Sequence, residues 1–296
     1  MRDSMHDAMQ KLLDELTSRN DKRINVFDIQ YLKLDNETLS LSGKLLHQDQ
    51  LAALEGAFSN HFPSLNLDTT SVQILSHAPR ERVHVATNLT GLYEKPTFGM
   101  PLSSELYFGT ELEVLDEQGK WVFARQRDEY LGWVYRSYLG EGLAPDATHL
   151  VLAPSVEVRV EPNETSKTAT RVVSGTGVTV AERLDGWSRI SANKTGWIPS
   201  SALRALTELP QTIEQKRATL IEDSMRMIGV PYLWGGSRAT ASIAQGLRAC
   251  SIIGSGSRFH ATQICSVTRR NLSSHPLKLA IYFSSVIGKA NDGLRM

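Results

Sequence analysis

The sequence is poor in several features that define whole classes of protein. Its 296 residues include only 2 cysteines, too few to build a disulfide framework. No apolar run approaches the length that crosses a bilayer, so we expect no membrane partner. The first ten residues, MRDSMHDAMQ, lack the apolar centre of a secretory signal. They predict a cytoplasmic protein, or an extracytoplasmic one if the start is misassigned.

Charge is balanced over the whole chain but not along it. The 32 basic and 32 acidic residues cancel, and a hydrophobic fraction of 41% excludes a wholly disordered chain. Residues 1–236 carry a net charge of −7, whereas residues 237–296 carry +7 and hold both cysteines. Those basic residues are scattered singly, apart from Arg269-Arg270, and no aromatic residues interleave with them. We therefore expect no nucleic-acid partner.

Residues 1–80 show the pattern of a small α+β domain. Apolar residues at helical spacing predict a helix over residues 3–19, and INVFDIQYLKL and TLSLSGKLL predict a hairpin. A second helix ends before Pro63, and TTSVQIL predicts a closing strand. Because the segment contains no nucleophile, ligand cluster or glycine-rich loop, we interpret it as a scaffold or docking domain.

Two stretches, residues 83–142 and 147–206, repeat one pattern. GTELEVLDEQGKW and GVTVAERLDGW are each followed by a polar turn and a Gly-Trp pair, at Gly132-Trp133 and Gly196-Trp197. Short strands with frequent turns predict two small β-barrels. The pattern resembles the bacterial SH3 domain, usually an accessory module for cell-wall recognition.

One segment of the first repeat carries candidate binding residues. In DEYLGW, Asp128 and Tyr130 are expected on or beside a short strand with Trp133, where alternate residues share a face. A carboxylate and a tyrosine can hold the amino end of a peptide. Trp121 and Trp187 are instead expected to pack in their barrels.

After Pro210 the chain is expected to form a helix ending at Gly229, and the segment MIGVPYLWGG at residues 227–236 spans the end of that helix. Two SH3 repeats, a helix and G-x-PYLWGG resemble the NlpC-type cell-wall cysteine peptidases. That resemblance implies a papain-like α+β domain over residues 211–296, of which only 211–236 match the family. In the family an Asp-Cys-Ser-Gly helix supplies the nucleophile and a later histidine the base. Neither Cys250 nor Cys265 lies in an Asp-Cys-Ser-Gly segment.

A slip of one base in the reading frame near Gly236 explains this loss. If each true codon joins the third base of one codon to the first two of the next, residues 240–246 permit G-I-D-C-S-G. In the same register, residues 259–266 permit P-R-D-A-D-M-Q and residues 277–284 permit E-A-G-D-L-L-F. Residues 293–296 together with the stop codon permit I-T-H-V. All four are family motifs in family order. We therefore expect the present chain to have no catalytic residues, and its peptidase domain to be truncated or disordered.

The sequence thus predicts an α+β multidomain protein with a small α+β unit, two SH3-like barrels and the start of a peptidase domain. The resemblance implies a hydrolase of γ-D-glutamyl-L-diamino-acid bonds in peptidoglycan-derived peptides, inactive as written. The alternative is a non-catalytic protein that binds wall peptides through its SH3 modules. The 8 histidines show no ligand spacing, and GSGSR at residues 254–258 follows no credible strand, so we expect neither metal nor cofactor.

Overall fold

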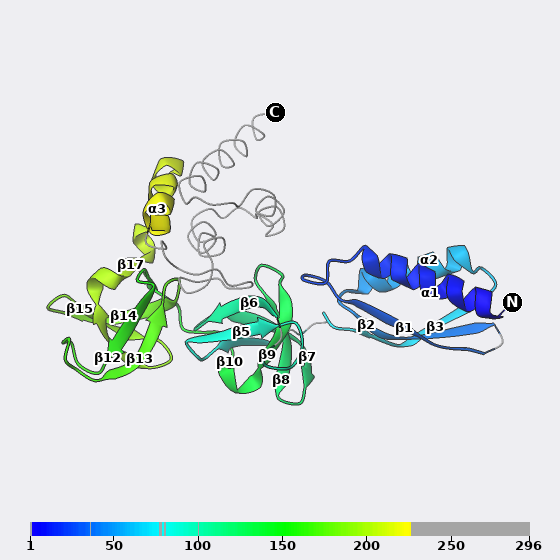
Figure 1. Cartoon of the computed structure of the whole chain (residues 1–296), viewed down its shortest axis with the longest axis horizontal. Helices are drawn as coiled ribbons and strands as arrows, with labels where there is room; N and C mark the ends of the chain where they lie inside the picture. Colours follow the sequence, from blue (N-terminus) through cyan, green and yellow to red (C-terminus); the bar gives the residue numbers. More distant parts are fainter. Residues whose placement is uncertain (1, 36, 77–78, 80, 100, 226–296) are drawn as a thin grey trace. The chain divides into compact units, whose positions relative to one another are not determined.

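The computed structural model describes every residue except 1, 36, 77–78, 80, 100 and 226–296 (Figure 1). The described residues are mostly β, with seventeen strands and three α-helices. They form two compact units. The first contains Met1–Val83, Leu92–Ser103 and Glu111–Gly142, and the second contains His84–Gly91, Ser104–Thr110 and the described part of Leu143–Met296. Among the described residues, no helix is long and apolar enough to span a membrane.

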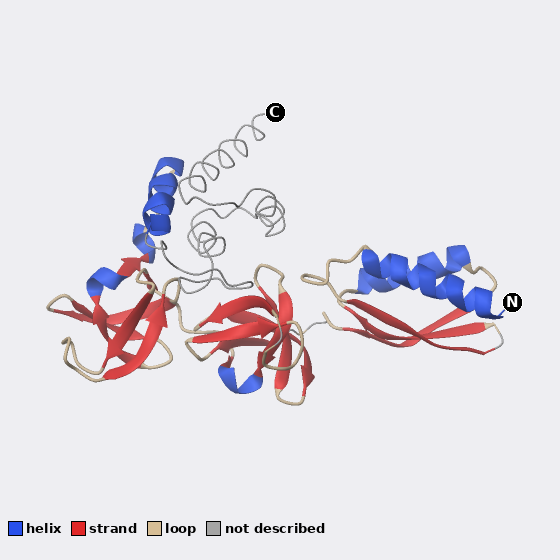
Figure 2. Cartoon of the chain, viewed as in Figure 1, coloured by secondary structure: helices blue, strands red, loops and turns tan. Residues whose placement is uncertain are grey.

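The first eighty residues form the elements that the sequence predicts. Helices α1 (Arg2–Ser18) and α2 (Gln48–His61) lie on one face of a three-stranded sheet (Figure 2). Strands β1 (Phe27–Asp35) and β2 (Thr38–Leu45) form the antiparallel hairpin, and β3 (Asn66–Ile74) runs parallel to β2. Apolar residues from both helices and from the sheet, including Leu13, Leu41 and Leu54, make the core. Strand β3 begins three residues earlier than predicted, since its first residues are only partly buried and lack a strong apolar alternation.

The first barrel contains seven strands in the order β10-β4-β7-β8-β9-β5-β6. The strands are β4 (Arg82–Val85), β5 (Leu89–Tyr93), β6 (Leu102–Tyr107), β7 (Glu111–Gln118), β8 (Trp121–Gln126), β9 (Leu131–Tyr135) and β10 (Leu139–Glu141). A short 3-10 helix, η1 (Arg136–Tyr138), joins the last two. Gly132 on β9 is required by packing, because a Cβ there would lie 2.6 Å from Leu92 Cγ and 2.8 Å from the Tyr93 carbonyl oxygen.

The second barrel repeats this arrangement in the order β13-β12-β16-β15-β14-β11-β17. Its strands are β11 (His149–Val151), β12 (Ser155–Arg159), β13 (Thr168–Val173), β14 (Gly177–Leu184), β15 (Trp187–Ser191), β16 (Thr195–Pro199) and β17 (Leu203–Ala205). The 3-10 helices η2 (Ser200–Ala202) and η3 (Leu206–Glu208) follow β16 and β17. Gly196 matches Gly132, since a Cβ there would lie 2.6 Å from the Arg159 carbonyl oxygen.

Helix α3 (Ile213–Met225) follows the second barrel, where the sequence predicts a helix. An ion pair between Arg204 on β17 and Asp223 on α3 (3.1 Å) fixes the helix to that barrel, and both side chains are largely buried. The predicted end of this helix at Gly229, the PYLWGG motif, and the segment expected to be truncated or disordered lie outside the described residues.

Within the first compact unit, the α+β domain and the first barrel share a buried apolar cluster. It consists of the buried Leu46, Leu75, Leu115 and Leu131, with Val26 and Phe123 packed against it. Leu46 and Leu75 follow β2 and β3, whereas Leu115 and Leu131 belong to strands of the barrel. The α+β domain and the barrel therefore contact each other through a shared apolar cluster.

Candidate peptide-binding site

The three predicted binding residues belong to one hairpin, formed by β8 and β9 of the first barrel. The turn between these strands covers residues 127–130. Its backbone is closed by hydrogen bonds from Gln126 N–H to the Tyr130 carbonyl (2.9 Å) and from Glu129 N–H to the Gln126 carbonyl (3.0 Å). Glu129 adopts a left-handed backbone conformation (φ 72°), which is unusual for a residue other than glycine.

This turn corrects the strand argument for Asp128 and Tyr130. Strand β9 begins at Leu131, so both residues precede it, and the left-handed Glu129 between them removes the alternation of an extended strand. The two residues are linked by a different contact, a hydrogen bond from the Tyr130 backbone N–H to the Asp128 carboxylate (3.3 Å). Asp128 thus helps to shape the turn that presents it.

The three side chains differ in exposure. Tyr130 is only 8% exposed, Asp128 is exposed, and Trp133 is half-buried. The Trp133 ring packs against Phe123 on the adjacent strand, with ring centroids 5.0 Å apart. The hairpin therefore combines an accessible carboxylate with two aromatic side chains that are largely held by packing.

The corresponding turn of the second barrel lacks these groups. It joins β15 to β16 with Ala192, Asn193 and Lys194, where the first barrel has Arg-Asp-Glu-Tyr. Although the barrels share a strand order, only the first presents an acid and a tyrosine at this hairpin.

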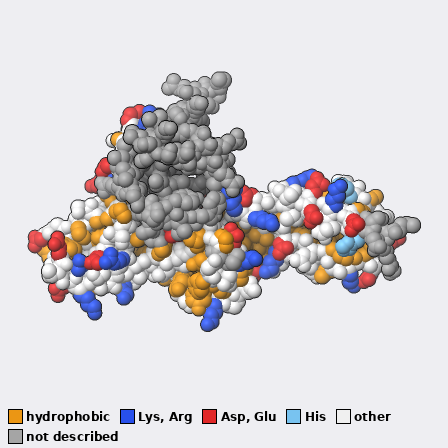
Figure 3. Space-filling model, in the orientation of Figure 1, with side chains coloured by type: hydrophobic (Ala, Val, Ile, Leu, Met, Phe, Trp, Pro, Cys, Tyr) orange, Lys and Arg blue, Asp and Glu red, His pale blue; other side chains and the backbone are white. Residues whose placement is uncertain are grey.

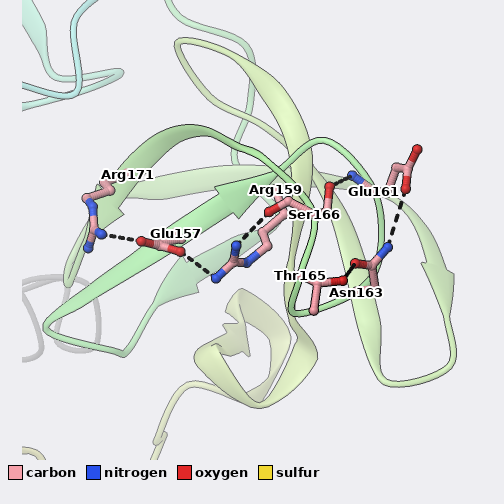
Figure 4. A network of polar contacts seen from close by, with 7 residues as sticks. All are labelled: Glu157, Arg159, Glu161, Asn163, Thr165, Ser166 and Arg171. Carbon is pink, nitrogen blue, oxygen red and sulfur yellow. Dashed lines mark hydrogen bonds and ion pairs between the residues drawn. The ribbon is translucent and has the colours of Figure 1, made fainter.

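The second barrel instead contains a polar network around the turn between β12 and β13 (Figure 4). Glu157 pairs with Arg159 (2.5 Å) and with Arg171, and Arg159 Nη1 donates to the Ser166 carbonyl (2.6 Å). Ser166 Oγ in turn accepts the Glu161 backbone N–H at 2.9 Å. These contacts satisfy backbone groups within the turn, which assigns the network to stabilising the loop.

A cluster of aromatic rings on the first barrel was not expected from the sequence. Phe98, which is 51% exposed, contacts four other rings with centroid separations from 4.8 to 6.4 Å. Its neighbours are Tyr93, Trp121, Tyr135 and Tyr138. Figure 3 shows hydrophobic side chains gathered over the lower part of this barrel. Burial raises the pKa of the Tyr93 hydroxyl. Trp121 is packed against other side chains, as expected, but at the surface.

No group of three potential metal ligands occurs among the described residues. Among the histidines of this part of the chain, His149 lies beside an arginine, with its Nε2 atom 2.8 Å from Arg183 Nη2. Desolvation together with the arginine charge lowers the pKa of His149.

Both barrels match known protein families. Residues 92–139 match the family described as "Bacterial dipeptidyl-peptidase Sh3 domain", and residues 154–204 match the bacterial SH3 domain family. No curated protein matches the chain.

Several solved structures resemble the chain. An NlpC/P60 family protein from Bacillus cereus ATCC 10987 is 15% identical, with a TM-score of 0.48 over 57% of this chain and 72% of that one. NlpC2 from Trichomonas vaginalis is 18% identical, with a TM-score of 0.20 over 55% of this chain and 61% of that one. NlpC1 from the same organism is 17% identical, with a TM-score of 0.23 over 60% and 66%. The two family matches carry the assignment: this chain contains two bacterial SH3 domains.

Proposed function

We propose that this chain is the substrate-binding part of a peptidoglycan-peptide hydrolase, a γ-D-glutamyl-L-diamino-acid endopeptidase of the NlpC type. The observation that supports this most strongly is the match of residues 92–139 to a dipeptidyl-peptidase SH3 domain. It lies upstream of the PYLWGG motif at residues 231–236, which resembles the start of the NlpC peptidase domain.

In the intact gene product, a cysteine thiolate would attack the γ-D-glutamyl carbonyl and form a thioester, releasing the amine of the diamino acid. Water would then hydrolyse the thioester, with a histidine transferring the protons. As written, the chain carries neither group in a family motif. Because such groups act together, loss of either removes most of the catalysis. We therefore propose that the chain binds the peptide but does not cleave it.

The hairpin of the first SH3 domain supplies chemistry that fits the amino end of this peptide. A free amine is a cation, and Asp128 presents a carboxylate at the turn. Aromatic side chains of Tyr130 and Trp133 lie in the same hairpin. A charge-assisted hydrogen bond from the amine to Asp128 would distinguish a free amino end from a blocked one.

A non-catalytic wall-peptide binding protein is the second candidate. It is favoured by the literal sequence, which has no Asp-Cys-Ser-Gly segment after the glycines at 235–236. Resequencing the DNA across codons 230–245 separates the two. A base missing from or added to the present reading restores the peptidase, whereas an unchanged sequence leaves only the binding function.

Binding itself is tested by calorimetry with L-Ala-γ-D-Glu-diaminopimelate and its N-acetylated form. We expect the free peptide to bind more tightly, and Asp128→Asn to remove that preference. Asparagine retains the oxygen that accepts the Tyr130 backbone N–H, so the turn is preserved while the charge is lost. Equal affinity of the parent chain for both peptides would contradict the assignment of Asp128.

A further inference from the structure

The α+β domain contacts the candidate hairpin directly. Its loop between α1 and β1 lies against the start of β9, where the Leu131 backbone N–H donates a hydrogen bond to the Arg23 carbonyl (2.8 Å). Leu131 is the residue that follows Tyr130 and is only 3% exposed. A segment more than one hundred residues earlier in the sequence therefore forms part of the surroundings of the Asp128–Tyr130 turn.

That loop has a well-defined shape. The Asp21 carbonyl accepts the backbone N–H groups of Ile24 (3.0 Å) and Asn25 (2.9 Å). The Asp21 carboxylate accepts the Arg23 backbone N–H (3.0 Å). It also accepts two donors of the Arg23 guanidinium, Nε at 3.0 Å and Nη2 at 2.6 Å. The hydrogen bonds from Arg23 hold the pKa of the Asp21 carboxyl below its usual value. The guanidinium is thus held in one orientation, while 44% of the side chain stays exposed.

Further contacts keep the loop in place on the barrel. Val26, at the end of the loop, packs against the buried leucine cluster that joins the two folds. Lys44 pairs with Asp116 of the barrel, and Arg125, paired with Glu113 at 2.8 Å, lies 3.5 Å from His47. Apolar burial at Val26, the Lys44–Asp116 ion pair and the Arg125–His47 contact therefore join the α+β domain to the barrel that carries the hairpin.

We propose that the α+β domain completes the peptide site, with the Asp21-held guanidinium of Arg23 binding a free carboxylate of a peptide whose amino end faces Asp128. The inference rests on the proposed function and names a specificity element for it. In a γ-linked glutamyl peptide the α-carboxylate of glutamate is not part of the chain, so it remains free and close to the amino end. A guanidinium that is already oriented is the donor best suited to a planar carboxylate.

The test is calorimetry on the full chain with two peptides, L-Ala-γ-D-Glu-diaminopimelate and the same peptide with the glutamate α-carboxylate converted to a carboxamide. We expect Arg23→Gln to weaken the carboxylate peptide by about tenfold or more, the loss typical of a charged hydrogen bond, and to leave the carboxamide peptide unchanged. Arg19→Gln is the matched control. Arg19 also pairs with an acid, Glu15, at 2.5 Å, but it lies in an exposed pair near the end of α1.

Two results would overturn the inference alone: an affinity that Arg23→Gln does not change, or an equal loss for both peptides. Failure of the parent chain to bind either peptide would instead overturn the proposed function, and the inference with it. Asp21→Asn provides a second variant should Arg23→Gln not fold. It keeps the guanidinium but weakens its anchoring, so a smaller loss, again confined to the carboxylate peptide, is expected.

Discussion

Docking of the α+β domain on the first barrel makes a quantitative prediction for Leu46. This side chain is 1% exposed and belongs to the leucine cluster between the two folds. Truncation to alanine removes about three carbon groups, worth roughly 2.4 kcal/mol at ~0.8 kcal/mol each. The cavity left behind adds to this loss, and buried Leu→Ala changes cost about 2–5 kcal/mol. We take about 3 kcal/mol as the expected destabilisation.

Hydrogen exchange measured by mass spectrometry on the full chain shows which segments are destabilised by this substitution. A change of about 3 kcal/mol corresponds to a roughly 150-fold faster exchange of amides that are exposed only by unfolding of the unit. Because the cluster is shared, we expect faster exchange both in β1 and β2 and in β8 and β9. The amide of Leu131, bonded to the Arg23 carbonyl, should be among those affected.

The control is Leu184→Ala in the second barrel, where the side chain is 45% exposed. We expect a change of at most about 0.5 kcal/mol there and no effect on the first unit. If Leu46→Ala accelerates exchange only in the α+β domain and leaves β8 and β9 unchanged, the two folds are independent. The α+β domain would then not contribute to the peptide site.

Three other predictions concern glycine and histidine positions. Gly132→Ala should destabilise the first barrel, since its Cβ would meet Leu92 Cγ at 2.6 Å, and a lowered melting temperature would show it. Gly56→Ala, with open space around it on α2, should raise stability by up to about 1 kcal/mol in urea titrations. The pKa of His149 is lowered, so the unfolded chain binds its proton more tightly. Stability of the second barrel should be full above about pH 6.5 and fall below it; His149→Gln should flatten that dependence, and an unaltered pH profile would contradict the assignment.

Periodicity and turn residues were enough to predict the first helix, the hairpin, the second helix and the repeated barrels. These elements depend on the local alternation of apolar and polar residues and on glycines at close approaches. Gly132 and Gly196 have the same role in the two repeats. The conformation of the Asp128–Tyr130 turn could not be predicted in this way. Its geometry depends on a left-handed Glu129, and nothing in the residue types around it requires that conformation.

The contact between the α+β domain and the barrel also could not be predicted from the sequence. Leu46 and Leu115 sit in apolar patterns that fit a strand core of either fold, so their pattern does not show that they face another domain. Likewise, nothing in the sequence distinguishes Arg23 from an ordinary charged loop residue. Only the hydrogen bond from Leu131 to its carbonyl places it beside the candidate site.

We propose that this chain derives from a cell-wall peptidase whose catalytic segment is read out of frame. The most direct test is hydrolysis of L-Ala-γ-D-Glu-diaminopimelate by two proteins, the present chain and one in which the frame after Gly236 is restored. We expect the restored protein to release the diamino acid and the present chain to release none. Turnover by the present chain, or inactivity of a folded, peptide-binding restored protein, would contradict it.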